Sequence, residues 1–272
     1  MNKAPPLEKV MIQAAYKPLQ NSNLSNRSLQ KQQHPVISQL ATTIESIWHK
    51  QLMLFPYETP ADLGYVEGTL EGEQLVIQNI CYQTLQFRKL HLELASVGNT
   101  LDILHCVMFP HPCFNLPIFG VDIVAARGNI TAAIVDLSPV SSDGLLLANY
   151  RQALSALPVP QFASPRVLPD WGDIFSDCCL FVRPETPEES DLFLNQATQY
   201  LSLHCRLACE SIKVNDRSAR AAIWAGQNRY SQQQQKNDKT RRILERAFGK
   251  EWAQRYLETM LFDCAKEDLL EG

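Results

Sequence analysis

The sequence predicts an α/β fold in which helices cover an antiparallel β-sheet. From Gly64 onward the apolar residues alternate with a period of two, which is typical of strands, whereas after Leu137 they recur at helical spacing. The connections between the predicted strands are short and mostly rich in Gly, Asn and Pro, as in Gly98-Asn99-Thr100. Connections this short cannot hold the crossover helices that parallel strands need, so neighbouring strands should run antiparallel.

The elements follow one another in a simple order along the chain. A first helix is predicted over residues 36–54, where apolar residues recur at helical spacing and Pro35 suits the first turn. Strands are predicted at 65–69, 74–83, 87–97, 101–109, 118–126 and 130–137, and helices at 145–157, 188–212, 218–248 and 251–270. A sheet of this kind buries its apolar faces between helices, so the expected architecture is a sandwich.

The composition is that of a globular protein. The 272-residue chain carries 25 Lys and Arg against 29 Asp and Glu, has a net charge of −4 and is 45% hydrophobic. A chain of this length buries enough surface for one large domain, which we place at residues 31–272. Residues 1–30 are polar and unpatterned, and we expect them to form a disordered or loosely attached arm.

The sequence also lacks the signals of membrane insertion and export. Its longest apolar stretches, such as 101–109 and 118–126, are far shorter than the roughly 20 residues of a membrane span. The polar N-terminus has no apolar region of the kind found in secretory signals. We therefore expect a cytoplasmic protein whose eight cysteines remain reduced. The overall negative charge and the lack of a known motif argue against binding to nucleic acid.

Three successive strands carry ionisable residues where apolar ones are expected. His105 and Asp122 interrupt apolar rows on the strands 101–109 and 118–126, and His91 and Glu93 share a face of the strand 87–97. In a meander these strands lie side by side, which can gather all four residues on one face of the sheet. Burial raises the pKa of a carboxyl group toward values useful in proton transfer, so the four are candidate proton donors. A purely structural pair of His105 and Asp122 is an equally good interpretation of this pattern.

A metal site is a weaker alternative. His105-Cys106 and His111-Pro112-Cys113 place two imidazoles and two thiols within nine residues, but the spacing is not that of structural zinc sites. On a regular strand, Cys106 also points to the face opposite His105. The sequence has no GxGxxG, P-loop, GxSxG or HExxH motif. If the protein carries out redox chemistry, no flavin or nicotinamide motif is present to support it.

Residues 216–250 are basic within a chain that is acidic overall. They include nine Lys and Arg against three acidic residues, which gives a local charge of +6. A basic patch of this kind attracts an anionic ligand or an acidic partner. A solvated helix face is the simpler interpretation of the same charges.

Several long motifs resemble those of the ferredoxin-dependent bilin reductases. They are DLGYVEG at 62–68, FRKLHLEL at 87–94, LDILHC at 101–106 and QQQKNDKTRR at 233–242. The resemblance covers residues 35–265 and is strongest to the branch of the family that makes phycocyanobilin. It implies a three-layer α/β/α sandwich, with a central antiparallel sheet flanked by helices, that holds biliverdin IXα between the sheet and the C-terminal helices.

The resemblance also implies an enzymatic activity. Enzymes of this family take electrons one at a time from reduced ferredoxin, carry no redox cofactor and pass the bilin through radicals while protein side chains supply protons. In the phycocyanobilin branch the D-ring vinyl group is reduced before the A-ring. The alternatives are a sister reductase with another product and a bilin-binding carrier that performs no reduction.

By the same resemblance, the four polar residues of the sheet are the catalytic ones. Asp122 should protonate or hydrogen-bond the bilin near its pyrrole nitrogens and lactam oxygens, with His105 as its relay partner. His91 should lie at the opposite ring edge. Glu93 matches the acid that serves D-ring reduction.

Further residues match positions that contact the substrate or its electron donor. Arg166 and Thr131 match contacts to the bilin propionates, and Lys239 with Asn237 matches residues that line the pocket. A helix cap for Asn237 and a surface ion pair for Arg166 are the structural alternatives. We expect a monomer on which acidic ferredoxin docks at a basic patch formed by some of Arg229, Lys236, Arg241, Arg242 and Arg246.

Overall fold

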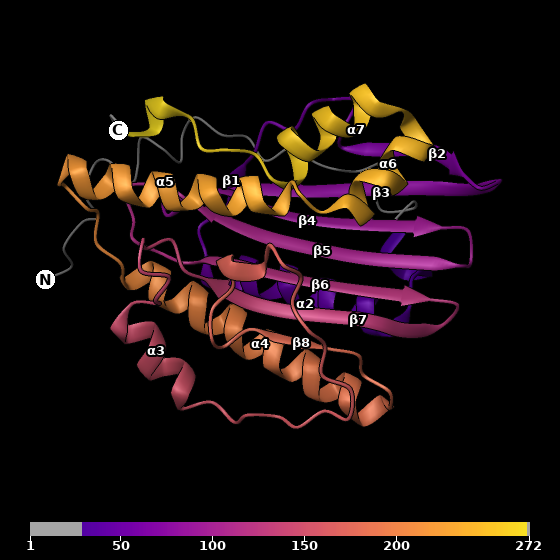
Figure 1. The fold of residues 1–272 in the computed structure, drawn as a ribbon, viewed down its shortest axis with the longest axis horizontal. Helices are drawn as coiled ribbons and strands as arrows, with labels where there is room; N and C mark the ends of the chain where they lie inside the picture. The colour runs from indigo at the N-terminus through magenta and orange to yellow at the C-terminus, as the bar shows by residue number, and fades with distance from the viewer. Residues whose placement is uncertain (1–28, 271–272) are drawn as a thin grey trace, which may run out of the picture.

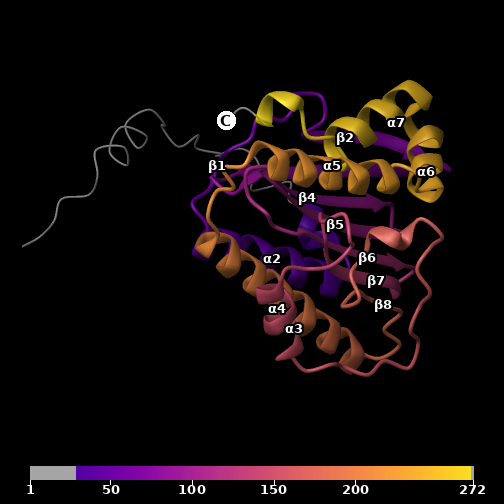
Figure 2. The ribbon, with the colours of Figure 1, turned by 60° about the vertical axis from the view of Figure 1, so that its left-hand side comes forward.

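The computed structural model describes residues 29–270, which form three layers, with a β-sheet between two groups of helices (Figures 1 and 2). The predicted α/β/α sandwich is confirmed. The sheet has eight antiparallel strands in the order β1-β3-β4-β5-β6-β7-β8, and β2 also pairs with β3. The strands are β1 (Phe55–Pro56), β2 (Tyr65–Leu70), β3 (Glu73–Gln83), β4 (Phe87–Val97), β5 (Leu101–Pro110), β6 (Ile118–Ala126), β7 (Asn129–Ser138) and β8 (Leu180–Val182).

The helices divide between the two faces of the sheet. They are α2 (Pro35–Gln51), α3 (Ala148–Ser155), α4 (Pro187–Glu210), α5 (Arg217–Gln234), α6 (Asp238–Phe248) and α7 (Lys250–Tyr256). A π-helical turn at Leu257–Leu261 continues α7, and short 3₁₀ turns lie at Leu29–Gln32, Gly172–Ile174 and Glu267–Leu270. Within residues 29–270, no helix has the length and apolar character needed to cross a lipid bilayer.

One face of the sheet packs against α2 and α4. Alternation along the strands turns Leu92, Cys106 and Val121 toward this face, where they are fully buried with apolar residues of the two helices such as Ile44 and Cys205. This is the larger of the apolar cores. The residues at the alternate positions of the same strands point to the opposite face of the sheet.

The opposite face packs against α5, α6 and α7 (Figure 1). Helix α5 approaches the segment that follows β7 so closely that a Cβ atom on Gly226 would lie 1.8 Å from the carbonyl oxygen of Val140. Only glycine fits there. Leu244 of α6 and Tyr256 of α7 share an apolar cluster with Leu75 of β3, so these helices are held over the end of the sheet that carries β2 to β4.

The predicted helix at 218–248 is wrong as a single element. It is two helices, because α5 ends at Gln234 and Asn237 caps a new helix, α6, by accepting a hydrogen bond from the backbone N–H of Lys239 at 3.2 Å. The predicted helix at 251–270 is also too long, since regular α-helix ends at Tyr256. Strands β1 and β8 were not predicted, because two or three residues are too few to show alternation.

Residues 1–28 of the predicted N-terminal arm lie outside the described residues. The last two residues of that arm, Leu29 and Gln30, belong to the first 3₁₀ turn. Leu29 is buried, and its backbone N–H donates to Oε1 of Gln78 on β3 at 3.3 Å. The chain is therefore attached to the sheet two residues before the predicted domain boundary.

Candidate active site

The register of the sheet aligns one polar residue from each of four strands. Asn79 of β3 lies directly opposite Glu93 of β4, Glu93 opposite His105 of β5, and His105 opposite Asp122 of β6. Residues paired in this way point to the same face, and their side chains are close enough to interact. His91 is two residues along β4 on that face, and its ring centroid lies 5.9 Å from that of His105. The four residues predicted as proton donors therefore lie together.

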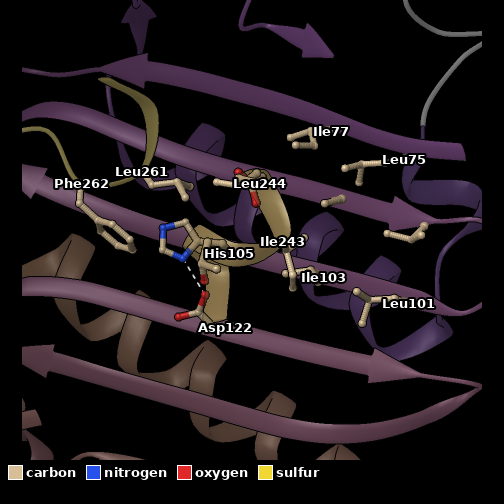
Figure 3. A pocket seen from close by; sticks show the side chains of 14 residues that line it. Leu75, Ile77, Leu101, Ile103, His105, Asp122, Ile243, Leu244, Leu261 and Phe262 are labelled. Carbon is tan, nitrogen blue, oxygen red and sulfur yellow. Dashed lines mark hydrogen bonds and ion pairs between the residues drawn. The ribbon is translucent and has the colours of Figure 1, made fainter. Parts of the chain in front are cut away.

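A pocket lies over this row, between the sheet and the C-terminal helices (Figure 3). The space between its lining atoms is about 670 Å³, part of it open to solvent. Three of the candidate donors line it, and the other walls are almost entirely apolar. Its lining residues are Leu75, Ile77, Glu93, Ala95, Val97, Leu101, Ile103, His105, Asp122, Thr240, Ile243, Leu244, Leu261 and Phe262.

His105 and Asp122 form a hydrogen-bonded pair at the floor of the pocket. His105 Nδ1 lies 2.6 Å from Asp122 Oδ1, and the side chain of Asp122 is 39% exposed whereas that of His105 is 8% exposed. Burial opposes the charged imidazole, but the charge and hydrogen bond of Asp122, with Glu93 nearby, raise the pKa of His105 above 6.5. His105 Nε2 is buried and has no hydrogen-bond partner among residues 29–270.

Glu93 is a buried carboxyl group between the pair and α7. Burial raises its pKa, while the charge of His105 and a hydrogen bond with the Tyr256 hydroxyl act against that rise and Asp122 adds to it. The net direction is upward, toward the protonated acid. Glu93 can therefore keep a proton at a pH where an exposed glutamate has lost it.

His91 has the opposite electrostatic environment. It is completely buried, and burial together with the cation of Lys89 and the nearby His105 lowers its pKa far below 6.5. Its Nε2 lies 2.7 Å from Oδ1 of Asn79. His91 is therefore neutral, and two neighbouring histidines differ in their preferred protonation state.

Lys89 links the electrostatics of the site to the wall of the pocket. Its ammonium group is fully buried, forms an ion pair with Asp263 and donates to the carbonyl oxygen of Met260 at 2.9 Å. The Arg88 guanidinium binds both the carboxylate and the backbone carbonyl oxygen of the same Asp263. These contacts hold the segment in which Leu261 and Phe262 occur, and the Phe262 ring lies edge-on to His105 with ring centroids 5.4 Å apart.

The predicted substrate-binding residues do not line the pocket. Arg166 donates from Nη1 to the backbone oxygen of Thr131 at 2.5 Å, and its guanidinium lies over the ring of Phe181. These two residues are therefore brought together, at the edge of the sheet formed by β7 and β8. Asn237 caps α6, and Lys239 is exposed in the first turn of the same helix.

The sheet separates two of the residues considered for a metal site, Cys106 and His105. Cys106 packs in the core against α2 and α4, on the face opposite His105. Within residues 29–270, no three His, Cys, Asp or Glu side chains are arranged to hold a metal ion.

Sequence reasoning missed several residues of the site. Asn79 could have been found, because alternation in the predicted strand 74–83 places it on the same face as Ile77 and the register then sets it opposite Glu93. Tyr256 gives no such signal, since its position depends on how α7 packs on the sheet. Lys89 was not singled out in the sequence, although its side chain is fully buried.

Most of the chain matches one known protein family. The family model for "Ferredoxin-dependent bilin reductase" matches residues 41–263, which is most of the chain. The chain belongs to this family. The resemblance that the sequence motifs suggested is confirmed, and the chain is a ferredoxin-dependent oxidoreductase.

Two curated relatives of this bilin reductase are named for the same activity. The chain is 54% identical over 247 residues to phycocyanobilin:ferredoxin oxidoreductase of Synechococcus sp. (strain PCC 6301), a match that covers 90% of this chain and 100% of the relative. It is 56% identical over 232 residues to the protein of that name from Trichodesmium erythraeum, covering 85% and 94% of the two chains.

A solved structure of low sequence identity has the same fold as this bilin reductase. Phytochromobilin synthase from tomato, solved in complex with biliverdin, superposes with a TM-score of 0.68 at 15% identity, covering 86% of each chain. At this identity the likeness supports the fold alone. It shows that the three-layer architecture persists where most residues differ.

The opposed protonation states of the two histidines can be tested by NMR. Asp122→Asn removes the carboxylate but leaves His105 buried, so the pKa of His105 should fall in a histidine-labelled sample titrated with pH. His91 should remain neutral in both proteins. Asp173→Asn, which removes an exposed carboxylate paired with Arg229, serves as the control and should leave the His105 titration unchanged.

The same pair makes the free energy of unfolding depend on pH. Because the folded state holds the His105 proton more tightly than the unfolded state does, the contribution is complete below pH 6.5 and is lost as the pH rises through the folded pKa. Denaturant titrations at several pH values should show this loss in the wild type and a smaller one in Asp122→Asn. An equal loss in both proteins would contradict the assignment.

Proposed function

We propose that this bilin reductase reduces biliverdin IXα to phycocyanobilin with electrons from reduced ferredoxin. The observation that carries the proposal is the row of Glu93, His105 and Asp122 at the floor of an otherwise apolar pocket. An apolar pocket with a few convergent polar groups suits a large planar substrate such as a linear tetrapyrrole. The names of relatives that are 54% and 56% identical to it over the aligned residues support the same reaction.

The reaction needs protons as much as electrons. Each carbon–carbon double bond that is reduced takes up two electrons and two protons. Ferredoxin supplies the electrons singly, so the bilin passes through radical states, and each added electron makes the bilin a better proton acceptor. Side chains that hold protons within the pocket are therefore the contribution expected of the protein.

The four residues of the site have separate roles in supplying protons to the bilin. Asp122 protonates or hydrogen-bonds the bilin near its pyrrole nitrogens and lactam oxygens, and His105, paired with it at 2.6 Å, relays the proton. Glu93, whose pKa is raised by burial, is the acid for the D-ring vinyl group, which is reduced before the A-ring. His91 lies at the other ring edge and contributes a neutral imidazole.

The propionates of the bilin extend from the pocket toward cations and hydroxyl groups. Arg166 and Thr131, which meet beside β7, are the proposed partners of these carboxylates. Lys239 and Asn237 begin α6, the helix that supplies Thr240 to the wall of the pocket, and are proposed to border the bound bilin.

Ferredoxin is proposed to dock on the basic surface around α5 and α6. No resident cofactor is needed, because electrons pass from the iron–sulfur cluster of ferredoxin to the bilin itself. Lys236 is exposed, and the side chains of Arg229, Arg242 and Arg246 are 46%, 72% and 69% exposed. Three of these cations also contact carboxylates, in the ion pairs Arg229–Asp173, Arg242–Asp238 and Arg246–Glu71.

We further propose that residues 31–272 act as one bilin reductase domain in a cytoplasmic monomer. The three layers share one sheet, and α6 with the turn that follows α7 completes the pocket whose floor is made by β3 to β6. Neither part could bind the bilin alone.

Anaerobic incubation with biliverdin IXα and enzymatically reduced ferredoxin tests the function directly. The absorption spectrum should change through intermediates, and chromatography should identify phycocyanobilin as the product. Another reduced bilin would assign the chain to a sister branch. Tight binding with no spectral turnover would identify a carrier and overturn the proposed activity.

Asp122→Asn should separate binding from proton transfer. The amide keeps the size of the side chain but cannot deliver a proton, so we expect biliverdin affinity within a few-fold of wild type and turnover lower by about 100-fold or more. Spectral titration and steady-state reduction measure the two quantities. Normal turnover in this variant would overturn the role of Asp122.

Glu93→Gln should stop the reaction before D-ring reduction. The amide is nearly isosteric and can still hydrogen-bond Tyr256, but it holds no acidic proton for the vinyl group. Biliverdin and its early radical states should accumulate, and chromatography should detect little phycocyanobilin. The final product appearing at the wild-type rate would refute the role of Glu93.

Arg242→Glu should weaken ferredoxin docking without affecting biliverdin binding. Reversing a charge on the proposed surface should raise KM for ferredoxin, with the difference shrinking at high salt because charge interactions are screened. Arg206→Glu is the matched control, since Arg206 is an exposed arginine with an acidic i,i+4 partner like Arg242 but lies on α4, across the sheet. Equal effects of the two substitutions would contradict the proposed docking surface.

A further inference from the structure

Asn79 and Tyr256 connect two of the proposed site residues through a short chain of hydrogen bonds. Asn79 Oδ1 lies 2.7 Å from His91 Nε2 and 3.0 Å from the Tyr256 hydroxyl, which also contacts Glu93 Oε2. Tyr256 is fully buried, and its ring stacks on Trp252 at a centroid distance of 4.8 Å. The two residues come from β3 and α7, so the chain of contacts crosses from the sheet to the helical layer.

The orientation of the Asn79 amide is fixed by its other end. Its Nδ2 donates to the backbone oxygen of Leu63 at 2.6 Å, which leaves Oδ1 facing His91 and Tyr256. An amide oxygen only accepts hydrogen bonds. His91 Nε2 must therefore carry a hydrogen, and since His91 is neutral, its buried Nδ1 is the unprotonated nitrogen.

The Tyr256 hydroxyl has one hydrogen but two oxygen neighbours. When that hydrogen is donated to Asn79 Oδ1, the contact with Glu93 is a hydrogen bond only if Glu93 is protonated and donates to the tyrosine oxygen. When Glu93 is ionised, the hydroxyl must turn to it and the contact with Asn79 is lost. The amide oxygen of Asn79 thus favours the neutral form of Glu93.

We propose that Asn79 is a positioning residue: by accepting the hydrogen of the Tyr256 hydroxyl it withholds that hydrogen from an ionised Glu93, and it fixes His91 with its hydrogen on Nε2. The inference rests on the proposed function, since it matters for catalysis only if Glu93 is the D-ring acid. Asn79 acts on Glu93 through the Tyr256 hydroxyl, and it acts on His91 directly. One amide therefore acts on the protonation of two residues of the site, Glu93 and His91.

Other ionisable groups also face Glu93 and are unchanged in the variants described next. They are His105 on β5, Asp122 on β6, and Lys89 and His91 on the same strand as Glu93, with Cys81 on β3. Their charges act on Glu93 in the wild type and in the variants alike. A difference between variants therefore reports the hydrogen bonds of Asn79 and Tyr256.

A double-mutant cycle of Asn79→Leu and Tyr256→Phe tests the connection. Leucine has nearly the shape of asparagine but no acceptor, so Tyr256 is free to donate to an ionised Glu93 and the acid loses its proton at lower pH. The alkaline limb of the D-ring reduction rate should move to lower pH, with a loss of about tenfold on that limb, less than the roughly 100-fold expected when an acid is removed. In the Tyr256→Phe background, Asn79→Leu should not move the limb any further.

Tyr82→Phe is the matched control for the loss of a hydroxyl group. Tyr82 is on β3, but its ring packs against Trp48 and His49 of α2, on the other face of the sheet. In Tyr82→Phe, the pH dependence of the D-ring reduction rate should match that of the wild type. The proposal is overturned if Asn79→Leu leaves the profile in place, or if its effect is the same with and without the Tyr256 hydroxyl.

Two spectroscopic measurements keep the test independent of turnover and of the folding of Asn79→Leu and Tyr256→Phe. Infrared spectra should show a protonated carboxylic acid band that Glu93→Gln removes, and nitrogen NMR should show the hydrogen of His91 on Nε2. A hydrogen on Nδ1, or no such band, overturns the proposal. Failure of the wild type to form phycocyanobilin would instead refute the proposed function while these two readouts still decide the inference.

Discussion

The register of β3 to β6 is the constraint on which the site depends. It places Asn79, Glu93, His105 and Asp122 directly opposite one another in a single row. Because side chains alternate between faces, a slip of one residue in any of these strands would move its polar residue into the core against α2 and α4. The apolar residues of that core, packed on both sides of each polar one along the strand, therefore also set the geometry of the chemistry.

Most of the fold, and the centre of the site, could be predicted because both follow from the spacing of apolar residues along the chain. Alternation marks the six longer strands, short connections make them antiparallel, and a polar residue within an apolar row is visible as an exception to the pattern. His105 and Asp122 are such exceptions. Once the strands are placed side by side, their meeting follows without any knowledge of the helices that cover them.

The remaining features depend on tertiary contacts that have no local pattern. The break between α5 and α6 arises from a cap at Asn237 within a run of helix-forming residues, and periodicity continues across it. Tyr256 reaches Glu93 only because α7 packs on the end of the sheet, at a separation of 163 residues along the chain. Lys89 looks like a solvated residue in sequence because its partner, Asp263, is near the other end of the protein.

Lys89 shows how the wall of the pocket and the protonation of its floor are coupled. Its ammonium group holds the segment around Met260 and Asp263 against β4, and the same charge lowers the pKa of His91 two residues away. Breaking a buried ion pair by removing one partner costs about 3–5 kcal/mol, so this cation is tightly fixed in place. A fixed cation is a constant electrostatic influence, whereas Glu93 and His105 respond to the charges around them. One face of the sheet thus carries a neutral histidine, a carboxyl group of raised pKa and a histidine–carboxylate pair, because each has different neighbours.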